Sequence, residues 1–231
     1  MTPPQRIAIY DLDRTITSVP TWTLFLLYAA RRSAPWRLAL VPLLPLLALG
    51  KAAGAYDRDR LKELMHRTML GPLLSAPRVE AITAAFADMM VARHLRPGAR
   101  AQIAADRAEG RRIVIATASH AFVAAPIAQR LGIAELIATQ ARRDEAGNLL
   151  HRLAGPNRYA GAKHRAVLAW LVERGIERGE ATIRFYSDDV SDAETLAWAD
   201  EPVAVNPGKA LRRLADANGW PVRDWGTPRT R

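Results

Sequence analysis

The stretch RIAIYDLD, residues Arg6–Asp13, joins a short apolar run to two carboxylates at its end. A short apolar run bounded by polar residues predicts a buried strand. Asp11 and Asp13 are two residues apart, so along an ideal strand both side chains would point to the same face. The stretch therefore predicts a buried strand that delivers a pair of acids to one end of a sheet.

Further apolar runs follow along the chain, and helical patterns separate them. Strands are predicted at Arg112–Ser119, Glu135–Thr139, Ile183–Asp189 and Pro202–Asn206. Helices are predicted at Ala121–Leu131, Ala162–Arg174, Asp192–Ala199 and Gly208–Asn218. Strands that alternate with helices indicate a parallel sheet covered on both faces. The predicted fold class is therefore α/β.

The interval after the first strand departs from this alternation. A helical pattern runs from Ile16 to about Leu95, with amphipathic stretches at Asp57–Leu70 and Arg78–His94. We therefore predict a core built from residues 1–17 and 96–231, with residues 18–95 inserted as a helical cap.

The cap interval contains an unusual apolar run, LALVPLLPLLAL, at Leu38–Leu49. As a helix it would extend only ~18 Å, which is short of the ~30 Å hydrocarbon core of a membrane. With Trp22–Tyr28 it could form an apolar hairpin that rests in a lipid interface, so residues 22–50 are a predicted peripheral membrane contact. The alternative is packing inside the cap or in a dimer contact. The basic residues that flank the run are Arg31, Arg32, Arg37 and Lys51.

Composition narrows the classes of protein. The 231 residues include no cysteine, which excludes a disulfide framework, a cysteine-ligated zinc site and a thiolate nucleophile. The net charge of +10 comes mainly from arginine, and no basic stretch interleaved with aromatic residues indicates a nucleic-acid partner. No signal-peptide pattern opens the chain. We therefore expect a cytoplasmic protein, with a place on the inner face of the membrane if the apolar run binds lipid.

Polar side chains cluster where the predicted strands end. They are Asp11, Asp13, Thr117, Ser119, Asp188 and Asp192. In parallel sheets, ligands bind outside the carboxyl ends of the strands. Close carboxylates repel one another, and a divalent cation with oxygen ligands, such as magnesium, can hold them together. Taken singly, acids at strand ends are equally typical of turns and helix caps.

These residues, in this order, resemble the haloacid dehalogenase superfamily of phosphatases, in particular its phosphoserine phosphatase-like branch. Asp11–Thr15 matches the first motif, DxDxT, and Ile113–Thr117 matches the second, an apolar strand that ends in Ser or Thr. Lys163 matches the third motif, and Ser187–Asp192 resembles the fourth. The resemblance covers nearly the whole chain and implies a Rossmann-like core with an inserted C1-type cap.

The resemblance also implies roles for the matched residues in a magnesium-dependent phosphoric monoester hydrolase. Asp11 would be the nucleophile that forms an aspartyl-phosphate. Asp13 would act as general acid and then as general base. Thr117 and Lys163 would bind phosphoryl oxygens. The implied magnesium ligands are oxygens of Asp11, Asp13, Asp188 and Asp192.

Several positions near the motifs bear on the substrate. Arg14 could contact substrate or face solvent, and Ser119 could line the pocket together with His120, although a surface position is at least as expected for His120. Pro20 stands where similar phosphoserine phosphatases carry a glutamate that holds the substrate's amino group, which argues against phosphoserine.

The apolar run favours a different class of substrate. The stretch at Leu38–Leu49 resembles that of phosphatidylglycerophosphate phosphatases, which implies a membrane lipid phosphate as substrate. A soluble phosphomonoester such as phosphoserine or histidinol phosphate is the alternative. A phosphotransferase that uses the same intermediate is a further one.

Overall fold

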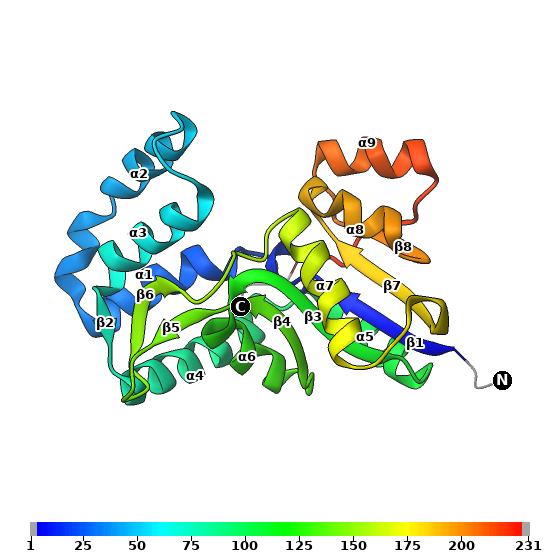
Figure 1. The fold of residues 1–231 in the computed structure, drawn as a ribbon, viewed down its shortest axis with the longest axis horizontal. Helices are drawn as coiled ribbons and strands as arrows, with labels where there is room; N and C mark the ends of the chain where they lie inside the picture. Colours follow the sequence, from blue (N-terminus) through cyan, green and yellow to red (C-terminus); the bar gives the residue numbers. More distant parts are fainter. Residues whose placement is uncertain (1–3, 228–231) are drawn as a thin grey trace.

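In the computed structural model, which describes residues 4–227, a six-stranded sheet forms the centre of the core (Figure 1). The strand order is β4-β3-β1-β7-β8-β9, and each neighbouring pair is parallel. The strands are β1 (Gln5–Tyr10), β3 (Arg112–His120), β4 (Glu135–Thr139), β7 (Ala181–Ser187), β8 (Glu201–Val205) and β9 (Val222–Arg223). The predicted α/β class with a parallel sheet is confirmed.

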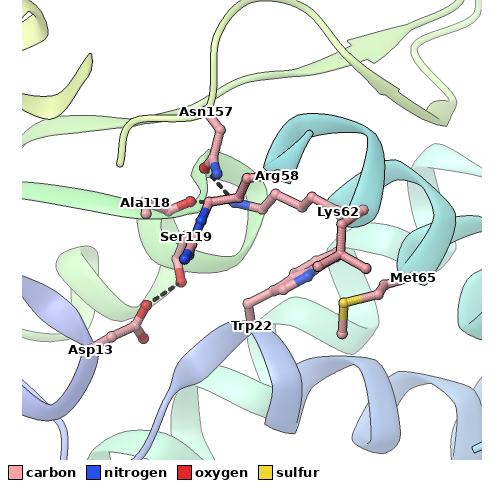
Figure 2. Close-up of a pocket in the computed structure, with 9 residues that line it drawn as sticks. Asp13, Trp22, Arg58, Lys62, Met65, Ala118, Ser119 and Asn157 are labelled. Atoms are coloured by element: carbon pink, nitrogen blue, oxygen red, sulfur yellow. Dashed lines mark hydrogen bonds between the residues drawn. The ribbon is translucent and has the colours of Figure 1, made fainter. Parts of the chain in front are cut away.

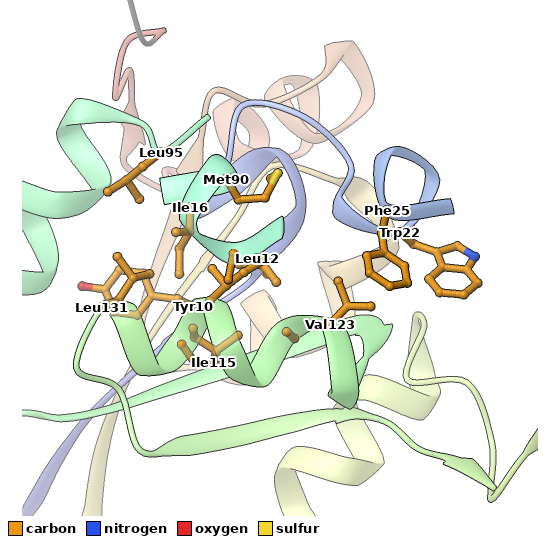
Figure 3. Close-up of a cluster of buried hydrophobic side chains, with 14 of the residues drawn as sticks. Tyr10, Leu12, Ile16, Trp22, Phe25, Met90, Leu95, Ile115, Val123 and Leu131 are labelled. Atoms are coloured by element: carbon orange, nitrogen blue, oxygen red, sulfur yellow. The ribbon is translucent and has the colours of Figure 1, made fainter. Parts of the chain in front are cut away.

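The first strand lies inside the sheet, between β3 and β7. Side chains alternate across a strand, so Ile7 and Ile9 pack on one face while Ala8 and Tyr10 pack on the other. The cluster on the Tyr10 face continues into the inserted segment through Phe25, as Figure 3 shows. One continuous apolar core therefore supports both the sheet and the segment inserted after it.

Helices cover both faces of the sheet. Residues of α7 (Gly161–Glu173), α8 (Ala193–Trp198) and α9 (Lys209–Asn218) pack on the Ile7 face, and residues of α5 (Pro97–Ala108) and α6 (Ala121–Arg130) pack on the Tyr10 face. Short helical turns complete the core at η1 (Leu12–Ile16), η3 (Arg178–Glu180) and η4 (Val190–Asp192).

The inserted segment forms a lobe of its own beside the sheet (Figure 1). Its helices are α1 (Thr21–Ser33), α2 (Leu43–Ala52), α3 (Arg58–Leu70) and α4 (Ala76–Arg93), with the 3-10 turn η2 (Pro35–Leu40). The chain enters and leaves this lobe side by side, because the Ser18 amide donates to the His94 carbonyl (2.8 Å) and the Arg96 amide to the Ile16 carbonyl (3.0 Å).

The expectation of helix throughout the insertion is wrong at β2 (Leu73–Leu74). This strand pairs with β6 (Leu149–Leu153), which pairs with β5 (Ala141–Arg143) in a three-stranded sheet. The sequence did not indicate β5 and β6 either. The two-residue β2 carries little pattern of its own, and its partner β6 is distant in the chain. By contrast, β5 and β6 form a local hairpin around the turn at residues 144–148. The small sheet ties the cap to the core.

The predicted apolar hairpin is not formed. Trp22–Tyr28 belongs to α1, and its Trp22, Phe25 and Leu26 are buried in the core cluster, because their spacing puts them on one helix face. The run Leu38–Leu49 packs inside the cap only in part: Leu38, Val41 and Leu44 are partly buried against the core cluster, whereas Leu43, Leu46 and Leu49 are exposed. Over residues 4–227, no helix is both long and apolar enough to cross a membrane.

Candidate active site

Asp11 and Asp13 lie where the chain turns sharply after β1. The Asp11 amide still donates to the Tyr186 carbonyl at 2.9 Å, which continues the pairing with β7. Arg14 then adopts a positive φ of 60°, which is uncommon for a residue with a side chain. The guanidinium of Arg96 donates to the Arg14 carbonyl at 2.9 Å and so supports this turn. The turn leaves Asp11 buried beneath the sheet edge and Asp13 only partly buried.

Lys163, on the first turn of α7, joins two acids at this edge. Its ammonium is 2.7 Å from Asp11 Oδ1 and 2.7 Å from Asp192 Oδ2, and all three side chains are buried. Burial opposes the charge of Lys163, but the two carboxylates outweigh it and hold the pKa of Lys163 above its usual value. Burial raises the pKa of Asp11 well above its usual value, although Lys163 opposes the shift.

The end of β7 supplies the remaining acids. The Ser187 hydroxyl donates to Asp192 Oδ2 at 2.7 Å, and the Thr15 hydroxyl donates to Asp188 Oδ1 at 3.1 Å. Burial raises the pKa of Asp188 to about 6, although the Thr15 hydrogen bond opposes the shift. Asp188 is half-buried, and no cation in the described part of the chain forms an ion pair with it.

Asp13 has different partners. Its Oδ1 accepts from the Thr21 amide and hydroxyl, each at 2.6 Å, and its Oδ2 accepts from the Ser119 hydroxyl at 2.8 Å. The Thr21 and Ser119 hydroxyls also lie 2.5 Å apart. The Thr21 and Ser119 hydroxyls and the Asp13 carboxylate thus form one hydrogen-bonded cluster. The sequence did not single out Thr21, whose amide is one of the free donors at the start of α1.

Asp13 stands between two cavities. The first, of about 330 Å³, we call the aspartate cavity; its lining includes Asp11, Asp13, Arg14, Arg58, Tyr159, Lys163, Asp188 and Asp192. The second, of about 180 Å³, we call the cap cavity, and Figure 2 shows it. Its lining is Asp13, Trp22, Arg58, Leu61, Lys62, Met65, Ala118, Ser119 and Asn157. Only Asp13, Arg58 and Ala118 line both cavities.

Of the other residues predicted for the site, some line a cavity and some do not. Ser119 lines the cap cavity, and the exposed Arg14 lines the aspartate cavity. Thr117 is fully buried, lines neither cavity, and accepts a hydrogen bond from the Ser119 amide at 3.0 Å. A surface position for His120 is wrong: β3 extends through it, and the Trp22 ring lies against it with centroids 4.3 Å apart. Burial lowers the pKa of His120 well below its usual value.

Sequence reasoning missed three residues that line the cap cavity: Arg58 and Lys62 from the cap, and Asn157 from the segment between β6 and α7. For Lys62 a signal existed. Lys62, His66 and Met69 recur at helical spacing on the buried face of α3, so a lysine occupies a stripe that normally carries apolar residues. Lys62 is anchored there through its ammonium, which donates to the Ala118 carbonyl and, at 3.1 Å, to Asn157 Oδ1.

The donors around the aspartate cavity fit a magnesium ion in their chemistry. Asp11, Asp188 and Asp192 bring three carboxylates to this cavity, and within residues 4–227 Lys163 forms ion pairs with Asp11 and Asp192 but no cation pairs with Asp188. Asp192 Oδ1 is buried and has no hydrogen-bond partner among these residues. Carboxylate oxygens are the ligands that magnesium prefers. Within residues 4–227, however, no three acidic or histidine side chains are already grouped as a metal site. The ligands would therefore come together on binding.

Comparisons with known proteins agree with this arrangement. Residues 8–197 match the haloacid dehalogenase-like hydrolase family. Protein CicA of Caulobacter vibrioides is 33% identical over 84% of this chain and 83% of its own length. A histidinol-phosphatase of Neisseria meningitidis is 29% identical over 56% of this chain, which spans 59% of that protein.

Solved structures show the same fold. A protein of unknown function from Bordetella pertussis superimposes with a TM-score of 0.85 at 27% identity, over 96% of this chain and 100% of its own. A phosphoserine phosphatase, as a phospho-aspartyl intermediate analogue, superimposes with a TM-score of 0.65 at 14% identity, over 97% and 95%. From the family match and the site at the sheet edge, we conclude that the chain belongs to the haloacid dehalogenase-like hydrolase family.

Proposed function

We propose that this hydrolase is a magnesium-dependent phosphatase that forms an aspartyl-phosphate on Asp11. One observation carries the proposal. Asp11 is buried against the Lys163 ammonium, while Asp13, two residues on, is held by hydroxyls at the boundary of the two cavities. Two carboxylates in such different environments suit different roles, one as nucleophile and one as acid and base.

The roles follow from these positions. An Asp11 carboxylate oxygen attacks phosphorus from the aspartate cavity, the bond from phosphorus to the ester oxygen breaks, and Asp13 gives its proton to the departing oxygen. Asp13 then takes a proton from a water molecule, which attacks phosphorus and releases phosphate from Asp11. Lys163 lowers the repulsion between Asp11 and the anionic phosphoryl group and stabilises charge that develops on its oxygens.

A magnesium ion would be held by Asp11, Asp188, Asp192 and the backbone carbonyl of Asp13. When bound, it supplies positive charge that neutralises the phosphoryl oxygens. The three carboxylates support this part of the proposal, because among the described residues only Asp11 and Asp192 form ion pairs and Asp188 forms none.

The test is phosphate release from small phosphomonoesters with magnesium and with chelator. Asp11→Asn should lower kcat by at least about a thousandfold, since the nucleophile is removed. Asp216→Asn, at an exposed acid on α9 that does not line the aspartate cavity, is the matched control. Acid quenching should preserve a phosphorylated enzyme in wild type and none in Asp11→Asn. Hydroxylamine, which cleaves acyl phosphates to the hydroxamate, should then release the phosphate from the wild-type enzyme. Undiminished turnover in Asp11→Asn would refute the proposal.

The same intermediate could pass its phosphoryl group to an alcohol. Turnover in the presence of glycerol separates the two reactions, because a phosphotransferase would form glycerol phosphate in preference to free phosphate. We expect mainly free phosphate from a hydrolase.

We infer that the substrate is a lipid phosphate and that the cap touches an anionic membrane surface through residues 36–51. Trp36, Leu46 and Leu49 are 64%, 61% and 65% exposed. Between Asp13 and Asp57 the sequence has no acidic residue. Exposed apolar side chains with basic neighbours suit an interface of anionic lipid. The helix α2 also packs on α3, which lines the cap cavity (Figure 1).

Vesicle binding tests the membrane proposal. We expect the protein to sediment with vesicles that contain phosphatidylglycerol and to stay free with phosphatidylcholine alone. Leu46→Gln with Leu49→Gln should weaken binding about tenfold or more, because each removes exposed apolar surface from the contact. Val172→Gln, at a 78% exposed valine on α7 in the core, is the control. Equal binding by all variants, or a preference for soluble esters such as histidinol phosphate, would favour the soluble class of substrate.

A further inference from the structure

The cap cavity holds a buried lysine that has no acidic partner. Lys62 is 7% exposed, and its ammonium donates to two neutral oxygens, the Ala118 carbonyl and Asn157 Oδ1. Among residues 4–227, no carboxylate forms an ion pair with it. Lysine is seldom buried without such a pair. An ammonium has three hydrogens to donate, so one donor remains for a group in the cavity.

The rest of the cavity lining reinforces this shortage of acceptors. Asp13 is the only acid that lines it, whereas Arg58 lines it as a second cation. Asn157 uses its carbonyl oxygen for Lys62 and for the Thr139 hydroxyl, and its amide nitrogen makes no hydrogen bond to the described residues. Trp22, Leu61 and Met65 add apolar surface, and Ala118 and Ser119 complete the lining, with the Ser119 hydroxyl already bonded to Asp13. The cavity therefore offers donors and apolar surface, but almost no partner for an amine.

Lys62 lies close to where the leaving group would be protonated. Its ammonium binds the carbonyl of Ala118, and the hydroxyl of the next residue, Ser119, binds Asp13 at 2.8 Å. Figure 2 shows these bonds along the same wall of the cavity. A group that touches Lys62 is thus only a few atoms from the ester oxygen to which Asp13 would donate.

We propose that the cap cavity binds a leaving group with an anionic oxygen-bearing group beside the ester oxygen, and that Lys62 selects this group against an amine. The inference rests on the proposed phosphatase function and defines the substrate class of that site. A volume of about 180 Å³ is close to that of cavities that hold a benzene ring. Only the part of a substrate next to the phosphate fits, and the remainder extends outward.

Three esters of matched size test the selection. Phosphoglycolate carries a carboxylate beside the ester, ethyl phosphate a methyl group, and phosphoethanolamine an ammonium. We expect kcat/KM to fall in that order, by about tenfold at each step. The carboxylate of phosphoglycolate gains a charge-assisted hydrogen bond from Lys62, and the ammonium of phosphoethanolamine is repelled by it. In Lys62→Met the ratio of phosphoglycolate to phosphoethanolamine should fall at least tenfold. Arg60→Met, on the same helix but paired with Glu63, should keep the wild-type ratio.

A second pair identifies the source of the anion. Glycerophosphoglycerol phosphate, the soluble headgroup of a lipid, presents a phosphodiester, and phosphoglycolate presents a carboxylate. Preference for either ester over ethyl phosphate supports the proposal, and the preferred one shows whether the cavity binds a phosphodiester or a carboxylate.

Other outcomes separate the inference from the function it rests on. Equal or better turnover of phosphoethanolamine, or an unchanged ratio in Lys62→Met, would overturn the selection by Lys62 while the phosphatase stands. If no ester is hydrolysed, the proposed function fails, and calorimetry on Asp11→Asn still ranks binding of the three esters. Tighter binding of phosphoglycolate would then support the cavity's preference, and tighter binding of phosphoethanolamine would refute it.

Discussion

The two cavities each contain a buried lysine, and the two lysines have opposite surroundings. Lys163 bonds to two carboxylates, and its pKa is held above the usual value. Lys62 bonds to two neutral oxygens, and burial lowers its pKa to about 7, although Asp13 and Asp59 oppose the shift. The comparison teaches that burial alone does not fix the role of a charge. In the core the cation balances acids already present, whereas in the cap it lacks a counterion that a ligand can supply.

Removal of the Lys163 cation should have the largest effect. Lys163→Met leaves Asp11 and Asp192 buried without their partner, and breaking a buried pair this way lowers the free energy of unfolding by about 3–5 kcal/mol. Turnover should fall at least about a hundredfold. Urea unfolding and steady-state kinetics measure both, with the exposed Lys209→Met as control. A variant as stable and active as wild type would show that the ion pairs are dispensable.

Magnesium should stabilise the Lys163 region and leave the Lys62 region unaffected. At a hundredfold excess over its Kd, a ligand of the folded state adds about 2.7 kcal/mol, which corresponds to a rise in Tm of several degrees. In thermal unfolding at pH 7, magnesium should raise the Tm of wild type and of Lys62→Met by the same amount. Asp188→Asn should lose most of the gain, because it removes a carboxylate from the aspartate cavity. An equal gain in Asp188→Asn would place the metal elsewhere.

The pH dependence of stability should separate the two lysines. Between pH 7 and 10.5 the unfolded chain binds a proton at Lys62 that the folded state has lost, so the free energy of unfolding should rise with pH, by at most about 1.4 kcal/mol per unit. Asp13, Asp59 and Arg58 are the charged groups whose fields act on Lys62. Between pH 7 and 9 Lys163 adds almost no slope, because it stays charged in the unfolded chain and its raised pKa keeps it charged in the folded state.

Urea midpoints at pH 7, 8 and 9 check this difference. In Lys62→Met, the free energy of unfolding should rise less steeply with pH than in wild type, because the contribution of Lys62 is gone. Identical slopes in the two proteins would mean that Lys62 is fully charged in the folded state at pH 9.

The smallest effect should be that of Lys62→Met on stability at pH 7. Loss of the Lys62 ammonium should change the free energy of unfolding by no more than about 1 kcal/mol, since it leaves no buried carboxylate without its ion-pair partner. The Thr139 hydroxyl still reaches both the Ala118 carbonyl (2.8 Å) and Asn157 Oδ1 (3.0 Å). Urea unfolding of Lys62→Met and Lys163→Met in parallel checks this difference. If both substitutions lower the free energy of unfolding equally, the two lysines do not differ in their contribution to stability.

The sequence predicted the core well, because its signals are local. The run before Asp11 and the apolar strands after it indicated a parallel sheet, and the strand ends indicated where polar groups meet. Asp11 and Lys163 are separated by 152 positions in sequence but form an ion pair. Motif order predicted their roles, and their contact follows from the topology of parallel strands.

The cap was less predictable, because its structure depends on partners. Trp22–Tyr28 is as apolar as an exposed lipid-binding segment, and only tertiary packing shows that it is buried in α1. The two residues of β2 carry no alternation, and β6 pairs with them across the chain. His120 and Lys62 are polar residues in buried positions, where composition alone predicts exposure.

The central position of β1 has a consequence for how the chain folds. Its partners are β3, which begins at Arg112, and β7, which begins at Ala181. Both edges of β1 therefore pair only with residues far along the chain. Pairings of such long sequence separation form slowly. Until then the backbone groups and apolar side chains of Ile7 and Ile9 are open to wrong partners, as in other slow-folding sheets. During synthesis, β1 therefore has no partner in the central sheet until β3 has been made, and its second edge stays unpaired until β7 has been made.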